Sequence, residues 1–252
     1  MNNRNIRTTS PITLGIIPAR GASTGVPRKN VCLVAGKPLI GWTIAAARQC
    51  PLLDRTIVST DDEEIAEVAR QYGAEVPFLR PADLALDSTP GILPLIHAVR
   101  WMEEHEDYRP DYVMLLQPTS PLRVAEDITT GICLAIERDA DTVVSLTEVK
   151  QHPFWALRMD SDGRTANFLD MDVLELERCY PRRQDLPAAY AENGALYLVR
   201  RDILLENSTL YGPKFYGFIM PFSRSVDVDT PLDVIVAEAL LTNSQDRQSL
   251  IS

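Results

Sequence analysis

The amino-acid sequence predicts a three-layer α/β domain with a mainly parallel β-sheet. Short apolar runs, typical of buried strands, alternate along the chain with longer segments whose apolar residues recur at helical spacing. Polar loops containing proline and glycine follow several of the apolar runs. Ligands of open parallel sheets bind beyond the carboxyl ends of the strands, so these loops are where a functional site is expected.

Each expected strand is a run of five or six mostly apolar or β-branched residues. The run at 112–116 is the most apolar and leads directly into a loop that begins with Gln117. The expected strands are residues 14–18, 55–60, 112–116, 142–146, 195–199 and 215–220.

The expected helices have recognisable ends. Pro38 precedes the first helix and Pro51 ends it, four acidic residues open the second at the positive end of its dipole, and Pro231 opens the last. The expected helices are residues 39–50, 61–72, 91 to about 105, 125–137 and 231–241.

The regular pattern fails between residues 150 and 190, where prolines and mixed charges indicate an inserted subdomain. We therefore expect an α/β core formed by residues 12–149 and 191–243. Polar residues 1–11 and 244–252 are expected to be flexible tails.

Composition narrows the class of protein. The chain has 252 residues, no apolar run approaching the roughly 20 needed to cross a membrane, and no secretory signal. Its net charge of −10 argues against a broad nucleic-acid surface. Four widely spaced cysteines are expected to be reduced thiols of a cytoplasmic protein: Cys32, Cys50, Cys133 and Cys179.

Charge is unevenly distributed along the chain. The first acidic residue is Asp54, so residues 1–53 carry +7 and the remainder carries −17. A basic, acid-free segment in an acidic protein suits a small polyanion, with a metal site elsewhere. Chance clustering of charge is the alternative.

The loop after the first expected strand combines glycines with cations. Gly21 and Gly25 permit close approach of the backbone, and Arg20, Arg28 and Lys29 supply positive charge, as a polyphosphate site requires. It is not a Walker A loop, which ends in Gly-Lys-Ser/Thr, and its glycine spacing is not that of a dinucleotide fingerprint. An ordinary turn with surface cations remains the alternative.

A second candidate site lies near the carboxyl end of the chain. Asp227 and Asp229 alternate with two valines, so in an extended segment both carboxylates face the same side. Two carboxylates can hold Mg²⁺ (or Mn²⁺), which prefers a few protein oxygens together with phosphate and water. Alternatively, Asp229 caps the helix that opens near Pro231.

The identities of residues 17–30 are more specific than the spacing of the glycines and cations among them. The segment reads Ile-Pro-Ala-Arg-Gly-Ala-Ser-Thr-Gly-Val-Pro-Arg-Lys-Asn. This resembles the signature I-P-A-R-G-G-S-K-G-x-P-x-K-N of the CMP-sialic acid synthetase (acylneuraminate cytidylyltransferase) family, which includes legionaminate and pseudaminate cytidylyltransferases. Further family landmarks follow in family order at residues 58–61, 79–85, 116–123, 183–187, 193–197 and 227–231.

The resemblance implies a Rossmann-like nucleotidyltransferase with a small dimerisation subdomain. The implied reaction joins CTP to the anomeric hydroxyl of a nine-carbon 2-keto sugar acid and releases pyrophosphate, with Mg²⁺ as cofactor, in glycan biosynthesis. The implied assembly is a homodimer in which residues 150–190 serve dimerisation and sugar binding, with neither nucleic acid nor membrane as a partner.

The resemblance also assigns roles to positions of this sequence. Gln117 offers an amide to base or sugar, unless it only ends a strand, and the Arg183 fork suits a carboxylate, unless it is a surface arginine beside Arg182. Asp87 suits a ribose hydroxyl or else a helix cap, and His152 could face the sugar. The implied catalytic residues are Arg20, Lys29 and Asp229, and the implied metal ligands are Asp227 and Asp229. The implied nucleotide-binding residues are Ala19, Arg20, Gly21, Ser23, Thr24, Lys29, Asn30, Arg80, Ala85, Asp87 and Gln117. The implied sugar-binding residues are Gln117, Arg183, Asn193 and Tyr197.

Thr24 departs from the family pattern, which has lysine there. Loss of one phosphate cation in a water-excluded site costs roughly 2–4 kcal/mol of transition-state stabilisation, by analogy with an oxyanion donor. Arg28 could supply a replacement. The departure keeps open a non-catalytic relative that binds nucleotide, or an enzyme that uses another nucleotide or a sugar phosphate.

Overall fold

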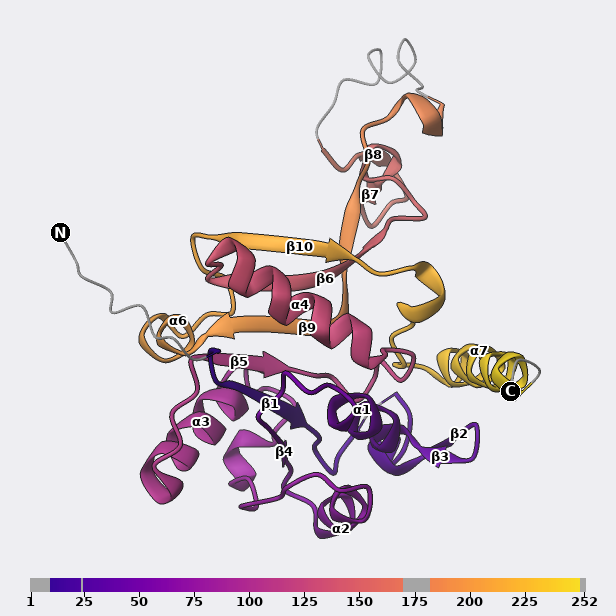
Figure 1. The fold of residues 1–252 in the computed structure, drawn as a ribbon. Helices are drawn as coiled ribbons and strands as arrows, with labels where there is room; N and C mark the ends of the chain where they lie inside the picture. The colour runs from indigo at the N-terminus through magenta and orange to yellow at the C-terminus, as the bar shows by residue number, and fades with distance from the viewer. Residues whose placement is uncertain (1–9, 24, 170–181, 250–252) are drawn as a thin grey trace, which may run out of the picture.

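The computed structural model describes residues 10–23, 25–169 and 182–249. Its centre is a six-stranded sheet in the order β10-β6-β9-β5-β1-β4 (Figure 1). Only β9 runs antiparallel to its neighbours, so the predicted mainly parallel sheet is confirmed. The strands are β1 (Thr13–Pro18), β4 (Arg55–Ser59), β5 (Tyr112–Leu115), β6 (Thr142–Glu148), β9 (Tyr190–Arg200) and β10 (Phe215–Ile219).

Helices cover both faces of the sheet, because successive strand side chains point to opposite faces. Ile17 packs on one face with α1 (Leu39–Arg48), α2 (Glu63–Gln71) and α4 (Ala125–Arg138). Its neighbour Ile16 packs on the other face with α3 (Leu93–Glu106) and α6 (Arg201–Asn207). The predicted three-layer α/β architecture is therefore confirmed.

The last helix is longer than expected. Helix α7 covers Pro231–Ser249, whereas we expected its end near residue 241 and a flexible tail from 244. No glycine or proline follows to stop it, and Thr242 and Asn243 donate hydrogen bonds to backbone carbonyls one turn earlier. The helix packs on the hairpin of β2 (Leu33–Val34) and β3 (Lys37–Pro38).

The start of α7 corrects a second expectation. Its cap is Thr230, whose hydroxyl accepts from the Asp233 N–H, while the Asp233 carboxylate accepts from the Thr230 N–H at 2.7 Å. This reciprocal pair is a capping box. The Asp229 side chain does not cap the helix and is left for another role.

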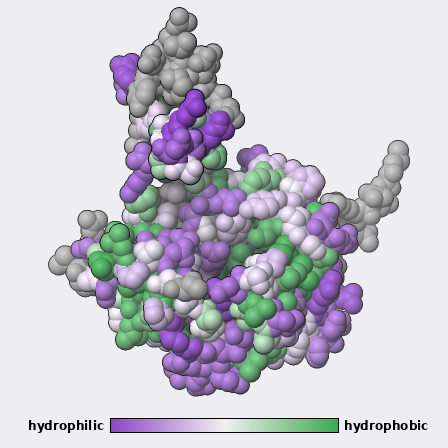
Figure 2. Space-filling view, turned by 180° about the vertical axis from the view of Figure 1, so that it is seen from behind, coloured by the Kyte–Doolittle hydropathy of each residue, from purple (hydrophilic) through white to green (hydrophobic). Residues whose placement is uncertain are grey.

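The inserted segment connects β6 to β9 and projects from the body of the molecule as an arm (Figures 1 and 2). Its described part is mainly a short hairpin of β7 (Leu157–Met159) and β8 (Thr165–Asn167), flanked by 3-10 turns at Pro153–Trp155 and Arg183–Asp185. At the base of the arm, the His152 ring contacts the Pro187 carbonyl at 3.0 Å and accepts from the Phe154 N–H. His152 is thus an internal brace of the arm, and the expectation that it faces the sugar is not supported.

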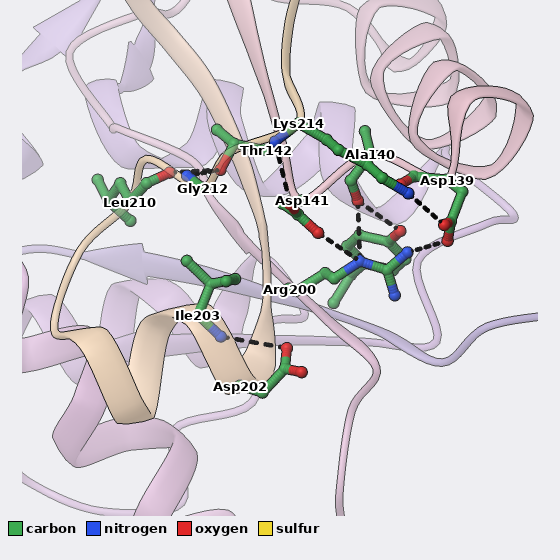
Figure 3. Close-up of polar contacts among 11 residues, drawn as sticks. Asp139, Ala140, Asp141, Thr142, Arg200, Asp202, Ile203, Leu210, Gly212 and Lys214 are labelled. Atoms are coloured by element: carbon green, nitrogen blue, oxygen red, sulfur yellow. Dashed lines mark hydrogen bonds and ion pairs between the residues drawn. The ribbon is translucent and has the colours of Figure 1, made fainter. Parts of the chain in front are cut away.

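An ion-pair network lies at the end of the sheet opposite the expected site. Arg200, at the end of β9, contacts Asp139 and Asp141, and Lys214 also bonds Asp139 (Figure 3). The network joins the amino ends of β6 and β10 to the carboxyl end of β9.

Among the described residues, no helix has the length and apolar character needed to cross a membrane.

Candidate active site

A cleft of about 670 Å³ opens at the carboxyl ends of the parallel strands. The loops after β1 and β5 and the loop between α2 and α3 line it, together with the segment before α7. An adjoining hollow of about 290 Å³ lies beside the β1 loop and includes Ser23. The predicted site residues that line the cleft are Arg20, Lys29, Asn30, Arg80, Ala85, Asp87, Gln117, Tyr197, Asp227 and Asp229.

Internal hydrogen bonds hold the β1 loop in shape. The Ser23 hydroxyl donates to the Val26 carbonyl at 2.7 Å and accepts from the Lys29 N–H, and the Asn30 amide donates to the Arg20 carbonyl. A Cβ on Gly25 would lie 2.1 Å from the Asp229 carbonyl oxygen, so only glycine fits there. The loop therefore packs backbone to backbone against the segment that carries the aspartates.

Two cations of this loop point into the cleft, each paired with a carboxylate. Arg20 forms an ion pair with Asp87. The Lys29 ammonium lies 2.8 Å from Asp229 Oδ1, although the two residues are 200 positions apart in the sequence. Asp87 therefore pairs across the cleft and does not cap α3, which has Ile92 and no side-chain cap at its start.

Arg28 is directed elsewhere. Its guanidinium pairs with Asp62 and Glu64 at the start of α2, and it lines neither the cleft nor the adjoining hollow. These hydrogen bonds lower the pKa of Asp62. A left-handed backbone at Arg28 (φ 52°) turns the side chain toward this acidic helix end. The expectation that Arg28 replaces a missing cation at position 24 is not supported, and Thr24 itself lies outside the described residues.

Ala19 and Gly21 do not line the cleft, although both were expected to bind nucleotide. The Ala19 N–H donates to the Ser59 carbonyl at 2.9 Å, and the Gly21 N–H donates to Asp61 at 3.0 Å. A Cβ on Gly21 would lie 2.7 Å from an Asp62 oxygen. Both residues therefore join the β1 loop to the β4 loop, with their N–H groups already in use.

Arg80 organises the loop between α2 and α3 on one wall of the cleft. Its guanidinium is buried and donates to the carbonyls of Ser59, at 2.7 Å, and Leu84. Burial lowers its pKa, while the charge of Asp61 partly offsets this. The group thus sets the position of residues 84–89, several of which line the cleft.

The aspartate segment has the predicted extended alternation. Val226 and Val228 pack toward α7, whereas Asp227 and Asp229 line the cleft. The Val228 N–H donates to the Thr119 carbonyl at 2.8 Å, which fixes the segment beside the β5 loop. Burial, with a smaller contribution from Asp229, raises the pKa of Asp227.

The donor set fits a magnesium ion that shares its coordination with a ligand. Among the described residues, no group of three or more histidine, cysteine, aspartate or glutamate side chains could hold a metal alone. Two carboxylates on one wall of a cleft still suit Mg²⁺, which usually keeps waters and phosphate oxygens as its other ligands. Magnesium therefore stays a prediction that Asp227 and Asp229 support.

Gly194, to which the sequence pattern assigned no role, shapes the middle of the cleft. Its φ of +73° favours glycine, and a Cβ would lie 2.8 Å from Gln117 Oε1 and 3.4 Å from Asp227 Oδ2. The absence of a side chain lets the amide of Gln117 and the carboxylate of Asp227 lie over β9. A glycine directly before the expected strand 195–199 is the signal that could have indicated this close approach.

Asn193 does not line the cleft, although it was expected to bind sugar. Its buried amide accepts from the Ser145 hydroxyl at 2.6 Å and donates to the Ser225 hydroxyl at 2.9 Å. The register of β6 and β9 shifts beside it, between Val144 and Leu146. Asn193 therefore satisfies the polar groups of a β-bulge and fixes the chain that leads to Asp227.

Arg123 is a buried support that the sequence did not reveal. It donates to the carbonyls of Gln117 and Ala195 and, at 2.7 Å, to the Thr43 hydroxyl. Burial lowers its pKa. Because it joins the end of β5 to β9 and α1, it holds the backbone of Gln117 in place.

The Arg183 side chain is outside what the structure describes, so its predicted contact with a carboxylate stays a prediction.

Sequence comparison matches this chain to proteins that use cytidine nucleotides. A family model described as cytidylyltransferase matches residues 14–240. A CMP-N,N'-diacetyllegionaminic acid synthase of Legionella pneumophila is 35% identical over 234 residues, 92% of this chain and 97% of that protein. A pseudaminic acid cytidylyltransferase of Campylobacter jejuni is 30% identical over 227 residues, 90% of this chain and 95% of that protein.

Solved structures agree on the fold. A CMP:2-keto-3-deoxy-manno-octonic acid synthetase complexed with CTP has a TM-score of 0.68 at 18% identity, and the match covers 92% of this chain and 99% of that one. A 4-diphosphocytidyl-2C-methyl-D-erythritol synthase of Anaerococcus prevotii has a TM-score of 0.63 at 14% identity over 92% and 97% of the two chains. The likeness confirms a nucleotidyltransferase fold.

Proposed function

The chain belongs to the cytidylyltransferase family, and we propose that it joins CTP to a nine-carbon 2-keto sugar acid, giving the CMP-sugar and pyrophosphate. The observation that carries the proposal is one cleft in which two cations, two carboxylates and an amide converge: Arg20, Lys29, Asp227, Asp229 and Gln117. Relatives similar over most of their length are named for legionaminic and pseudaminic acid, and both are sugar acids of this class.

The chemistry is an in-line displacement at phosphorus. The anomeric hydroxyl oxygen of the sugar acid attacks the α-phosphorus of CTP, and the bond from that phosphorus to the oxygen bridging the β-phosphate breaks. The hydroxyl proton leaves to water, and pyrophosphate carries away the negative charge. No covalent bond to the protein is needed, so catalysis consists of positioning and charge neutralisation.

The two cleft cations are suited to the departing pyrophosphate. Arg20 and Lys29 already pair with Asp87 and Asp229, so a bound triphosphate replaces one anionic partner by another. Asp87 is then free to accept from a ribose hydroxyl. The Asp229 side chain is 67% exposed, so it can accept the hydroxyl proton through water.

Magnesium is the proposed cofactor. Asp227 and Asp229 would hold it, and it would supply positive charge beside the reacting phosphate oxygens. The Lys29 ammonium and the Gly25 backbone both keep the Asp229 segment close to the phosphate loop. In the proposed complex, the two aspartates would lie between the triphosphate and Gln117.

The proposed assembly is a homodimer formed through the arm. Leu157, Met159 and Phe168 are 61%, 71% and 63% exposed there, an unusual display of apolar side chains for a small hairpin. Contact with a second copy would bury them. We also propose that the arm serves sugar binding, as the family resemblance implies.

The direct test is pyrophosphate release from CTP with Mg²⁺ and a panel of nine-carbon sugar acids. We expect release with at least one acid, and little with GTP, UTP or ATP in place of CTP. Nucleotide binding without release for every acid would instead support the non-catalytic alternative that Thr24 raised.

A further inference from the structure

The far end of the cleft contains two tyrosines that share one carboxylate. Tyr197 and Tyr211 both line the cleft. Each phenolic hydroxyl donates to the same atom, Glu192 Oε2, at 3.0 Å. Glu192 is not among the described residues that line the cleft, so it faces a bound molecule only through the two phenols.

The bulge in β9 creates this arrangement. Residues 192 and 197 are an odd number of positions apart, so in a regular strand their side chains would point to opposite faces. The register shift between Val144 and Leu146 lies between them and puts Glu192 and Tyr197 on the same face. The pairing of Glu192 with Leu146 holds the carboxylate on a regular part of the strand.

Tyr211 comes from the loop between α6 and β10, and that loop is also braced. The Thr142 hydroxyl donates to the Leu210 carbonyl at 2.7 Å and accepts from the Gly212 N–H at 2.9 Å (Figure 3). The Tyr211 ring packs edge to face on Phe215, with centroids 5.5 Å apart. Tyr197 lies on β9, hydrogen bonds hold the backbone on both sides of Tyr211, and Glu192 accepts from both O–H groups.

A phenol has one O–H donor and acceptor lone pairs. With both donors directed at Glu192, each phenolic oxygen can only accept a hydrogen bond from a ligand. We propose that Glu192 is a positioning residue for substrate specificity: by orienting Tyr197 and Tyr211, it makes this end of the cleft select a sugar-acid substituent that donates a hydrogen bond, such as an amide N–H or an ammonium. The inference rests on the function proposed above.

The test uses nine-carbon sugar acids that differ at one carbon only, where they carry an ammonium, a hydroxyl or a fluorine. Ammonium only donates and fluorine only accepts. The wild-type protein should have a higher kcat/KM for the ammonium than for the fluorine compound. Glu192→Leu removes the shared acceptor and frees both phenolic O–H groups to donate, so the ratio should fall about tenfold, as expected for one hydrogen bond. The KM for CTP should not change.

Two further variants decide how Glu192 acts. In a Tyr197→Phe/Tyr211→Phe background, Glu192→Leu should have no further effect on the ratio, because the two phenols through which it acts are absent. Glu206 is an exposed glutamate of α6 outside the cleft lining, so Glu206→Leu is the matched control and should resemble wild type.

An unchanged ratio in Glu192→Leu would overturn the inference, as would an effect that persists in the double phenylalanine background. Failure of the wild-type protein to use any acid with CTP would be a different result. It would overturn the proposed function, and the inference with it.

Discussion

Asp227 is a cleft residue whose charge opposes folding, and we propose that it holds the metal. Although the residue is exposed, partial burial of its carboxyl group raises its pKa, so its charge at neutral pH disfavours the folded state slightly. That cost is present above the raised folded-state pKa and disappears as pH falls through it. A carboxylate kept charged at such a cost is typical of a functional site.

We expect Asp227→Asn to raise the melting temperature at neutral pH and to lower Mg²⁺-dependent turnover steeply. The gain in melting temperature should fade at acidic pH, where the wild-type carboxyl is protonated as well. Asp229→Asn is the matched control: the Asp229 carboxylate pairs with the Lys29 ammonium at 2.8 Å, so its loss should lower turnover without a gain in stability. Near-normal turnover in both variants would show that these residues do not hold the metal.

The second residue-scale prediction concerns Thr24. Thr24→Lys adds the cation of the family pattern and should raise turnover with CTP more than it tightens CTP binding, because only interactions made in the transition state speed the chemical step. Arg28→Ala should leave turnover close to wild type, since Asp62 and Glu64 hold Arg28 away from the cleft. Steady-state kinetics of both variants, with Lys29→Ala as an impaired reference, provide the test. A severely impaired Arg28→Ala protein with unchanged Thr24→Lys would reverse this interpretation.

At the scale of elements, the bulged strand β9 is the structural support of the cleft. Its glycine permits Gln117 and Asp227 to approach, and its asparagine orders the chain before α7. Between α4 and that chain, the Arg224 guanidinium donates to both oxygens of the buried Asp127 carboxylate. One irregular strand therefore sets the geometry of residues from three parts of the sequence.

Gly194→Ala should cost about 1–2 kcal/mol of folding free energy from left-handed backbone strain, and should also raise the KM for the sugar acid because the new methyl group displaces the Gln117 amide. Gly163→Ala is a matched control, because that glycine has φ +86° and no atom lies within 4 Å of the place its methyl group would take. Denaturant unfolding of both proteins and sugar-acid kinetics distinguish strain from displacement. An unchanged KM in Gly194→Ala would remove Gln117 from the sugar site.

At the scale of the whole molecule, the arm is the part whose surface is least explained by the fold of one chain. We expect a dimer at micromolar concentration by light scattering, and a monomer after Leu157→Glu with Met159→Glu or after deletion of about residues 155–180. Both side chains are exposed, so the substitutions should not unfold the chain. Leu232→Glu on α7, at similar exposure, should leave the dimer intact. An intact chain that is monomeric would exclude the proposed assembly.

Local sequence patterns were sufficient to predict the layers, the mainly parallel sheet, the cationic loop after β1 and the aspartate pair. They are short-range signals: strand and helix periodicity, helix ends, and loops whose residue types match a phosphate or metal site. The resemblance to the family predicted further site residues, and ten of the predicted residues, from Arg20 to Asp229, line the cleft. The wrong prediction for the end of α7 also has a local cause, because a polar sequence without glycine or proline continues a helix.

Only the tertiary structure shows which polar groups contact one another. Lys29 pairs with Asp229 across 200 positions, Arg28 pairs with Asp62, and Asn193 is enclosed in a bulge and not exposed to a ligand. The same bulge places Glu192 beside Tyr197. No local pattern encodes these pairings, because a side chain's partner depends on strand register and on loops that meet only when the sheet has formed.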